Sequence, residues 1–309
     1  MILLAQSSVR IQHNWKTAGV LVPGLLLISA TPALADRIER RFKVEAHPVV
    51  TIHDPTGTVT VRAWTKSEVM VVAKRATDRV EVDAEQNANR IEISTRQILD
   101  NASTKDLRAD FEISVPEDTE LQIHNDSGGV NVSNVLGDMN VETIGADVAL
   151  EDAAGYLTIK TIDGGFQCAR CAGRIEASSI SGNFRFVDMR SYHVRAQTSE
   201  GNIFFNGEFF PNGMYQLKNY SGVIEVRFSP GDSFDLSATS MKGKVNNEAK
   251  LTPSSHHHSF RGVGNALFGS MNTGRAKVEL SSFNGTINIL KRDGLPPSQA
   301  ERAPEQSIP

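Results

Sequence analysis

The sequence lacks an excess of charge of either sign and, beyond its first 35 residues, any long hydrophobic run. It has 32 Lys and Arg residues against 36 Asp and Glu residues, which gives a formal net charge of −4 over 309 residues. A protein held to nucleic acid by bulk charge is therefore not expected. The mean hydropathy of −0.26 excludes a protein with many membrane spans. No segment after residue 35 is apolar enough to predict a transmembrane helix.

Residues 1–35 have the pattern of a secretory signal peptide. Arg10 and Lys16 precede an apolar run over residues 18–30, and the small-x-small tripeptide Ala33-Leu34-Ala35 follows it. The run is too short and too interrupted to anchor the chain in a bilayer. We therefore expect cleavage after Ala35 and an exported protein that is periplasmic, cell-surface-associated or secreted.

A repeat of about 18 residues governs most of the remaining chain. Its unit is Ser/Thr/Asn-x-x-Gly-x-φ-x-φ, where φ is apolar, and Ala146 replaces the glycine once. A short polar side chain can bond to the backbone of a tight turn, and glycine can adopt a positive φ angle there. We therefore predict a structural turn at each glycine of the unit, namely Gly128, Gly164, Gly182, Gly201, Gly222, Gly243 and Gly285.

Each period also contains a second, weaker turn, with glycines at Gly137, Gly155 and Gly173, and two short segments that alternate apolar and polar residues. Leu157 and Ile159, with Thr158 between them, are an example. A period of two with one apolar face is typical of half-buried strands and excludes helix. Strands this short cannot bury their apolar face alone, but stacked about 4.8 Å apart they enclose a continuous core.

The predicted fold class is all-β: a flattened β-solenoid with about 18–21 residues per rung. Right-handed winding is expected from the crossover preference of parallel strands, although the repeat itself does not determine it. An N-terminal β cap would protect the open end of the stack from edge pairing. The expected divisions are a signal peptide at 1–35, a β cap at 36–118, a repeat domain at 119–290 with an irregular insert at 251–271, and a proline-rich disordered tail at 291–309.

The order of these motifs resembles a known family. The motifs are the run Asp126-Ser127-Gly128-Gly129-Val130-Asn131-Val132, the pair Val115-Pro116 before it, and Gly57-Thr58-Val59-Thr60-Val61 followed by Trp64. Over roughly residues 40–290 the chain is similar to the "putative adhesin" family of exported bacterial β-strand-repeat proteins. The resemblance implies an envelope or surface β-solenoid of unknown function, without established catalytic residues. Some relatives are associated with cell-envelope stress responses.

Cys168 and Cys171 form a Cys-x-x-Cys pair at the end of a predicted strand and in the following turn. Redox catalysis would need a helix N-terminus to stabilise the thiolate, and the strand pattern predicts none there. No histidine follows Cys171, which excludes covalent haem attachment. In an oxidising compartment, a small-loop disulfide and two reduced thiols both remain open.

No metal and no cofactor is predicted. Calcium-binding β-rolls have rungs of this length, but their motif Gly-Gly-x-Gly-x-Asp is incomplete in the nearest copies, which begin at Gly128 and Gly164. His256-His257-His258 lies in the insert, and the sequence pairs no further ligand with it. An exposed loop is the expectation for this segment.

Most Phe and Tyr residues lie between residues 184 and 234. Several belong to the inward face of predicted strands. Four do not fit the inward register and are candidate exposed binding residues: Phe204, Phe209, Phe210 and Tyr220. Exposed aromatic rings can stack on a sugar or anchor a partner protein. The alternative is that these rings pack beneath the 251–271 insert.

The sequence contains no Ser/His/Asp grouping, no phosphate loop and no outward column of acidic residues on adjacent rungs. The favoured prediction is an exported, non-catalytic protein that acts by surface contact, as an adhesin-like protein or an envelope-associated scaffold. Its partner would be an envelope protein or a glycan, and no nucleic acid. Two alternatives remain open: a carbohydrate-active β-helix lyase or hydrolase, and an envelope-stress sensor or regulator acting through a partner protein.

Overall fold

The computed structural model describes residues 37–98, 108–253 and 264–292. These residues form strands, turns and bends and contain no helix, so the all-β fold class predicted from the sequence is confirmed. Consequently, none of the described elements is a helix with the length and hydropathy that a membrane crossing requires. The predicted signal peptide, the histidines at 256–258 and nearly all of the predicted tail lie outside the described residues.

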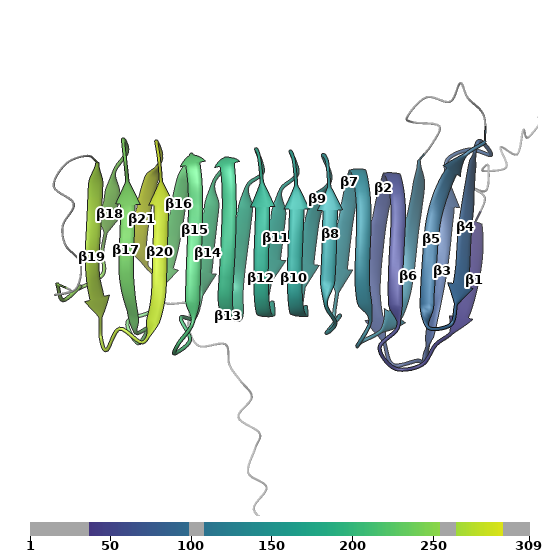
Figure 1. The fold of residues 1–309 in the computed structure, drawn as a ribbon, viewed down its shortest axis with the longest axis horizontal. Helices are drawn as coiled ribbons and strands as arrows, with labels where there is room; N and C mark the ends of the chain where they lie inside the picture. Colours follow the sequence, from purple (N-terminus) through teal and green to yellow (C-terminus); the bar gives the residue numbers. More distant parts are fainter. Residues whose placement is uncertain (1–36, 99–107, 254–263, 293–309) are drawn as a thin grey trace, which may run out of the picture. The chain divides into compact units, whose positions relative to one another are not determined.

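The strands form two ladders of mainly parallel pairs, which lie side by side in Figure 1. Ladder A contains, in the order of hydrogen-bonded neighbours, β4 (Val80–Asn87), β5 (Arg90–Gln97), β2 (Val49–Trp64), β7 (Glu120–Ser133), β8 (Met139–Thr143), β10 (Ala154–Thr161), β12 (Ala172–Ser179), β13 (Phe184–Glu200), β15 (Met214–Ser221), β20 (Ala276–Ser282), β17 (Phe234–Ser240) and β19 (Asn265–Met271).

Ladder B contains, in the same sense, β1 (Arg37–Lys43), β3 (Glu68–Arg75), β6 (Ala109–Pro116), β2, β7, β9 (Asp147–Glu151), β11 (Phe166–Ala169), β13, β14 (Ile203–Gly207), β16 (Val223–Phe228), β21 (Thr286–Lys291) and β18 (Val245–Asn247).

The long strands β2, β7 and β13 belong to both ladders. The first halves of β2 and β7 pair in ladder A, whereas the first half of β13 pairs in ladder B. The pairings of β7, β9, β11, β13, β12, β10 and β8 therefore close into a ring of seven parallel strands. Within this ring, 18 residues along the chain separate paired positions, as for Leu157 and Ile175. The predicted period is thus the register of the pairing, and one such period, with a strand in each ladder, is called a rung below.

The interior follows the alternation predicted from the sequence. Val148, Leu150, Leu157 and Ile159 are each at most 1% exposed, and equivalent positions on the other strands are buried as well. Side chains such as Thr158 lie on the outer faces. Because inward residues of both ladders belong to one cluster, the core is continuous from rung to rung.

Two expectations about the C-terminal part are wrong. The 251–271 insert is not wholly irregular, because β19 occupies Asn265–Met271 and pairs antiparallel with β17. No irregular rung separates Gly243 from Gly285 either. The rung of β20 and β21 lies between β15 and β17, so the ladder order departs from the chain order. A spacing of two periods in the sequence therefore corresponds here to direct neighbours.

Antiparallel strands stand at three of the four ladder ends. At the N-terminal side, β4 pairs antiparallel with β5, and β3 pairs antiparallel with both β1 and β6. At the C-terminal side, β19 covers β17. An antiparallel strand ends a parallel stack because it does not offer the next rung the same register of donors and acceptors.

Candidate functional site

The turns that lead from ladder A to ladder B, called the turn edge below, have a buried polar first residue. Asn125, Thr161, Thr198 and Ser282 are at most 7% exposed. Thr161 Oγ1 accepts a hydrogen bond from the Gly164 N–H at 2.9 Å, and Ser282 Oγ accepts one from the Gly285 N–H at 2.9 Å. Thr198 Oγ1 instead donates to the carbonyl oxygen of Gly182 on the neighbouring rung, at 3.1 Å. These side chains satisfy backbone groups that the turn would otherwise leave buried and unpaired.

The glycines of the turn edge are required mainly by close approach between rungs. A Cβ atom on Gly182 would lie 2.0 Å from the carbonyl oxygen of Gly164, far inside van der Waals contact. Only Gly128 and Gly222 have positive φ angles, of 118° and 104°. The expectation that each turn glycine needs a positive φ is therefore wrong for Gly164, Gly182, Gly201, Gly243 and Gly285.

The second residue of these turns is apolar and wholly or partly exposed on several rungs. Ile144, Ile162 and Ile180 follow one another on three consecutive rungs and are 50%, 48% and 57% exposed. Farther along, the exposed ring of Tyr220 stacks on Phe283, with centroids 4.7 Å apart. We call this row the turn ridge; in ladder order it consists of Ile144, Ile162, Ile180, Tyr220, Phe283 and Met241.

A hollow of about 440 Å³ lies beside the turn ridge, between Ile144 and Ile162 and the outer face of ladder A. Its polar wall includes Glu142 and Lys160, whose Nζ and Oε1 atoms are 2.9 Å apart. This hydrogen bond lowers the pKa of Glu142. Since the polar groups pair with each other, the apolar side chains are the part of this surface without a partner.

The turn ridge was missed from the sequence, although a signal was present. The three isoleucines are spaced 18 residues apart, at the first x of the Ser/Thr/Asn-x-x-Gly unit. The sequence interpretation considered apolar periodicity within the strands, where it identifies the core, and took the turns as polar.

The four predicted aromatic residues do not form one site. Phe209 is only 6% exposed, and its ring packs against Tyr215 and Phe234, with centroid distances of 4.8 and 5.0 Å. It is a core residue, so its predicted exposure is wrong. Phe210 is half-buried, and its N–H donates to the Tyr215 hydroxyl at 2.9 Å.

The other two aromatic residues lie on different surfaces. Tyr220 belongs to the turn ridge. Phe204 is half-buried on the outer face of ladder B, where the guanidinium groups of Arg185 and Arg227 lie 4.6 and 5.4 Å from its ring centroid. Its ring is therefore already engaged in cation–π contacts and offers a sugar little free surface.

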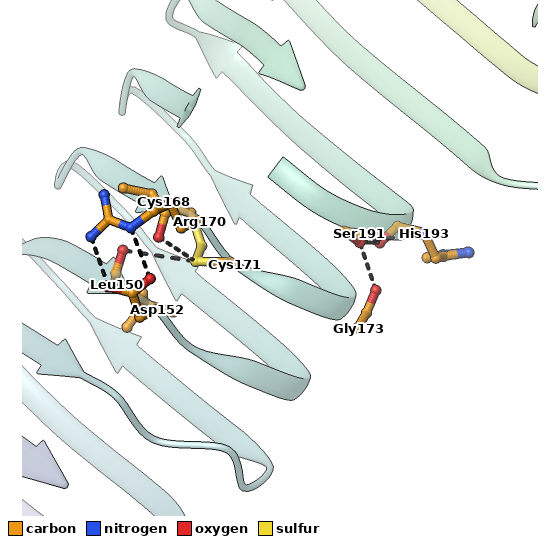
Figure 2. The surroundings of a disulfide bond; sticks show 9 residues. Leu150, Asp152, Cys168, Arg170, Cys171, Gly173, Ser191 and His193 are labelled. Atoms are coloured by element: carbon orange, nitrogen blue, oxygen red, sulfur yellow. Dashed lines mark hydrogen bonds and ion pairs between the residues drawn. A yellow bond between two sulfur atoms is a disulfide. The ribbon is translucent and has the colours of Figure 1, made fainter. Parts of the chain in front are cut away.

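Cys168 and Cys171 form a disulfide, and both residues are fully buried (Figure 2). Arg170, between them, pairs with the Asp152 carboxylate through two hydrogen bonds of 2.8 and 2.7 Å and also contacts Glu151. Because the sulfur atoms are enclosed in the core, a partner thiol has no access to them. The pair therefore stabilises the fold.

The disulfide lies at the edge where ladder B returns to ladder A, called the corner edge below. Four non-glycine residues there, 18 positions apart, have left-handed φ angles between 50° and 59°: Asn134, Asp152, Arg170 and Asp188. Asn and Asp tolerate this region better than other residues with side chains, which is the signal that the sequence offered for this edge.

The described residues contain no group of three or more side chains able to hold a metal ion. The stacked imidazoles of His53 and His124, 4.9 Å apart, have only Glu142 as a nearby carboxylate, 3.6 Å from His124 Nδ1. Nothing in this arrangement encloses an ion.

A chain of stacked parallel strands with a polar-glycine turn column defines an all-β repeat protein. Residues 48–290 match the family model described as Toastrack DUF4097, so the chain belongs to this family. This confirms the resemblance found in the sequence. A comparison with curated proteins finds no match.

Several solved structures are similar to the chain at low identity. A "putative cell adhesion protein" from Clostridium sporogenes is 13% identical, with coverage of 83% of this chain and 100% of that chain and a TM-score of 0.28. A "putative adhesin" from Bacteroides fragilis is 12% identical, with coverage of 83% and 97% and a TM-score of 0.35. A "putative lipid binding protein" from Parabacteroides distasonis is 11% identical, with coverage of 84% and 97% and a TM-score of 0.27. TM-scores this low do not establish a shared fold, and the family match is what places the chain.

Proposed function

We propose that this chain is an exported, non-catalytic β-solenoid protein that acts by surface contact, as an adhesin-like protein or an envelope-associated scaffold, and that the turn ridge contacts a partner protein. The two ladders would be the two walls of a flattened solenoid with right-handed winding. In support, the pairs advance by one period of the chain between the regular rungs, and both walls share one core. Signal peptide 1–35, cap 36–118 and repeat domain 119–290 belong to the same proposal.

The observation that carries the proposal is the exposure of three isoleucines on three consecutive rungs. The fold does not require an apolar side chain at this turn position, because Asp126 and Ser199 occupy it on other rungs. Single exposed apolar residues are common, but a contiguous row marks an interaction surface. The ridge spans six rung steps from Ile144 to Met241, or about 29 Å at 4.8 Å per step.

The charges beside the turn ridge favour a protein partner over a lipid surface. Lys160 and Lys242 adjoin the ridge, but so do Asp163 and Glu200. An anionic membrane selects a basic border around apolar side chains, which is absent from these described turns. A mixed border around an apolar centre is typical of protein interfaces.

The proposal is tested by site-specific photo-crosslinking of the full chain in the envelope of its own host. A benzophenone amino acid replaces Ile162 or Ile180 in the test variants and Thr158, on the outer face of ladder A, in the control. We expect both ridge positions to give the same adduct with one envelope protein and the control position to give none. The purified partner should then bind Ile162→Ser/Ile180→Ser at least tenfold more weakly, because buried apolar anchors dominate such interfaces.

Equal adducts from the ridge and control positions, adducts with lipid alone, or adducts with a second copy of this chain would each refute the proposed partner. Export is checked separately by N-terminal sequencing of the mature protein, which should begin at Asp36. A chain that retains residues 1–35 in the cytoplasm would overturn the proposed localisation.

A further inference from the structure

A groove crosses the outer face of ladder B, away from the turn ridge. It consists of two adjoining hollows of about 490 and 280 Å³ that share Asn131 and Ala149. Thr60, Asn131, Ala149, Gln167 and Arg185 form one row on successive strands. The hollows exist because glycine and alanine residues stand between the longer side chains.

The polar side chains of this groove lack the partners that outward residues have elsewhere. Within the described part of the chain, the side-chain amides of Asn131 and Gln167 make no hydrogen bond. On the outer face of ladder A, by contrast, Gln216 accepts from Arg195 at 3.0 Å and donates to Glu279 at 2.7 Å. The amides in the groove are therefore available to a ligand.

The acidic groups in the groove are engaged, whereas its two arginines are not. Asp147 Oδ1 accepts a hydrogen bond from the Gly165 N–H at 2.7 Å, and Glu151 pairs with Arg170. Arg62 and Arg185 form no ion pair with a described residue, although Arg185 lies over the ring of Phe204.

One carboxylate near the Arg62 end is also already occupied. The pKa of Glu112 is lowered chiefly by its hydrogen bond to Lys74 and to a smaller extent by Arg62. Four rung steps, about 19 Å, separate Arg62 on β2 from Arg185 on β13. The groove thus offers two guanidinium groups near its ends and neutral amides between them.

We propose that this groove binds a linear acidic oligosaccharide. Arg62 and Arg185 would hold sugar carboxylates, since a guanidinium group matches a carboxylate with two parallel hydrogen bonds. Asn131 and Gln167 would bind ring hydroxyls, because an amide side chain both donates and accepts, as a hydroxyl does. The direction of the groove across parallel strands lets successive sugar rings meet successive rungs.

Two other linear ligands fit the groove less well. A peptide strand cannot add to this surface, because the backbone groups of these strands are already paired within the ladder. Single-stranded nucleic acid binds through rings on which bases stack, and Phe204 is covered by Arg185 and Arg227.

The test is isothermal titration of the full chain with hexamers of galacturonate, with mannuronate hexamers as a second probe. Their carboxyl-reduced, neutral counterparts and a hexathymidylate are the comparison ligands. We expect at least one acidic hexamer to bind and its reduced form to bind about tenfold or more weakly, because a hydrogen bond to a charged group contributes that much.

Arg185→Ala should weaken binding about tenfold, whereas Arg195→Ala should change it less than twofold. The two arginines are matched, since both lie exposed on β13, one on each ladder. Ala149→Leu should abolish binding by filling the groove while removing no polar group. Thermal unfolding of each variant checks that it is folded.

Four results would each overturn the proposal: no binding of either acidic hexamer at millimolar concentration, equal binding of the reduced hexamers or of hexathymidylate, equal losses in Arg185→Ala and Arg195→Ala, or unchanged binding in folded Ala149→Leu. None of these results bears on the turn ridge, because crosslinking at Ile162 is a separate measurement on a separate surface.

Discussion

At the turn edge each rung passes from ladder A to ladder B through a buried polar residue and a glycine, whereas at the corner edge it returns through one residue with left-handed φ. The turn-edge glycines meet backbone atoms of the rung below: a Cβ on Gly182 would lie 2.0 Å from Gly164 O, and a Cβ on Gly285 would lie 1.9 Å from Gly222 O. Backbone atoms cannot move aside locally, so each turn fixes the next.

The corner edge is controlled more locally. Its left-handed residues carry side chains, as Asp188 does at a φ of 51°, and they point into solvent or into surface ion pairs. Its shorter glycine column ends after Gly173, where Ser191 takes the next position and donates to Gly173 O at 2.6 Å. The register shifts there by one residue. The corner edge thus accepts a side chain and an insertion, which the glycine contacts at the turn edge leave no room for.

The largest expected effect comes from adding one methyl group to the turn edge. Gly182→Ala should lower the free energy of unfolding by about 3 kcal/mol or more, because the clash involves backbone on the adjacent rung. Chemical denaturation measures it, with Gly231→Ala as the control, since a Cβ there meets nothing within 4 Å. Equal midpoints for the two variants would refute the steric account of the turn column.

The exception at Ala146 shows what the chain does when glycine is absent. There the preceding residue is Gly145, whose N–H donates to Asp126 O at 2.7 Å, and Thr143 Oγ1 donates to Ala146 O instead of accepting from an N–H. This turn has a different hydrogen-bond pattern. Gly182 is preceded by Ser181, so an alanine at position 182 lacks that alternative.

A smaller effect is expected from removing the disulfide at the corner edge. Cys168→Ala/Cys171→Ala should lower the free energy of unfolding by about 2 kcal/mol, through loss of a short loop closure and of buried sulfur. Because both sulfur atoms are buried, reductant should release thiols no faster than the chain unfolds. The chain has only these two cysteines, so thiol titration reads this directly. Rapid reduction of the folded protein would contradict the burial.

The turn edge also contains a titratable group that the corner edge does not match. Asp54 stands in register with Asn125, is 1% exposed, and its Oδ2 has no hydrogen-bond partner within the described residues. Burial raises the pKa of Asp54 to about 7 from an ordinary 3.8, against the opposing hydrogen bond from the Thr56 backbone. The folded state therefore holds the proton over a range in which the unfolded chain has lost it.

The contribution of Asp54 to stability is complete below pH 3.8 and is lost as the pH rises through about 7. Asp54→Asn, which cannot ionise, should match the parent protein near pH 5 and exceed its free energy of unfolding by about 1–2 kcal/mol near pH 8.5. Urea unfolding at the two pH values provides the measurement, and Asp126→Asn on the exposed turn position is the control. A difference between parent and Asp54→Asn that does not change with pH would rule out titration of this carboxyl.

The regular part of this fold could be predicted from the sequence because its signals are local. The alternation around Thr158 and the polar-glycine spacing each arise from a few adjacent residues, and they identify strands, inward faces and turns. The order of β15, β20 and β17 could not be predicted, since neighbouring rungs compete for similar edges and the spacing of Gly243 and Gly285 fits more than one arrangement.

The candidate surfaces were predicted less well for a related reason. Phe209 departs from the inward alternation because it follows β14 in a loop, and only the three-dimensional fold brings its ring into the core beside Tyr215. The free amides of Asn131 and Gln167 depend on Ala149 being small and on the absence of cross-strand partners. Both depend on contacts between residues that are distant in the chain.

The smallest effect, and the sharpest contrast with Gly182, is expected at Asp188 on the corner edge. Asp188→Gly relieves the cost of a left-handed φ of 51° but makes the unfolded chain more flexible, and these opposing terms should leave the free energy of unfolding within about 0.5 kcal/mol of the parent value. Asp188→Val should instead cost about 1–2 kcal/mol, because a branched side chain resists this region. If Asp188→Gly destabilised the protein as strongly as Gly182→Ala, the corner edge would also depend on contacts between rungs, and the distinction between the two edges would fail.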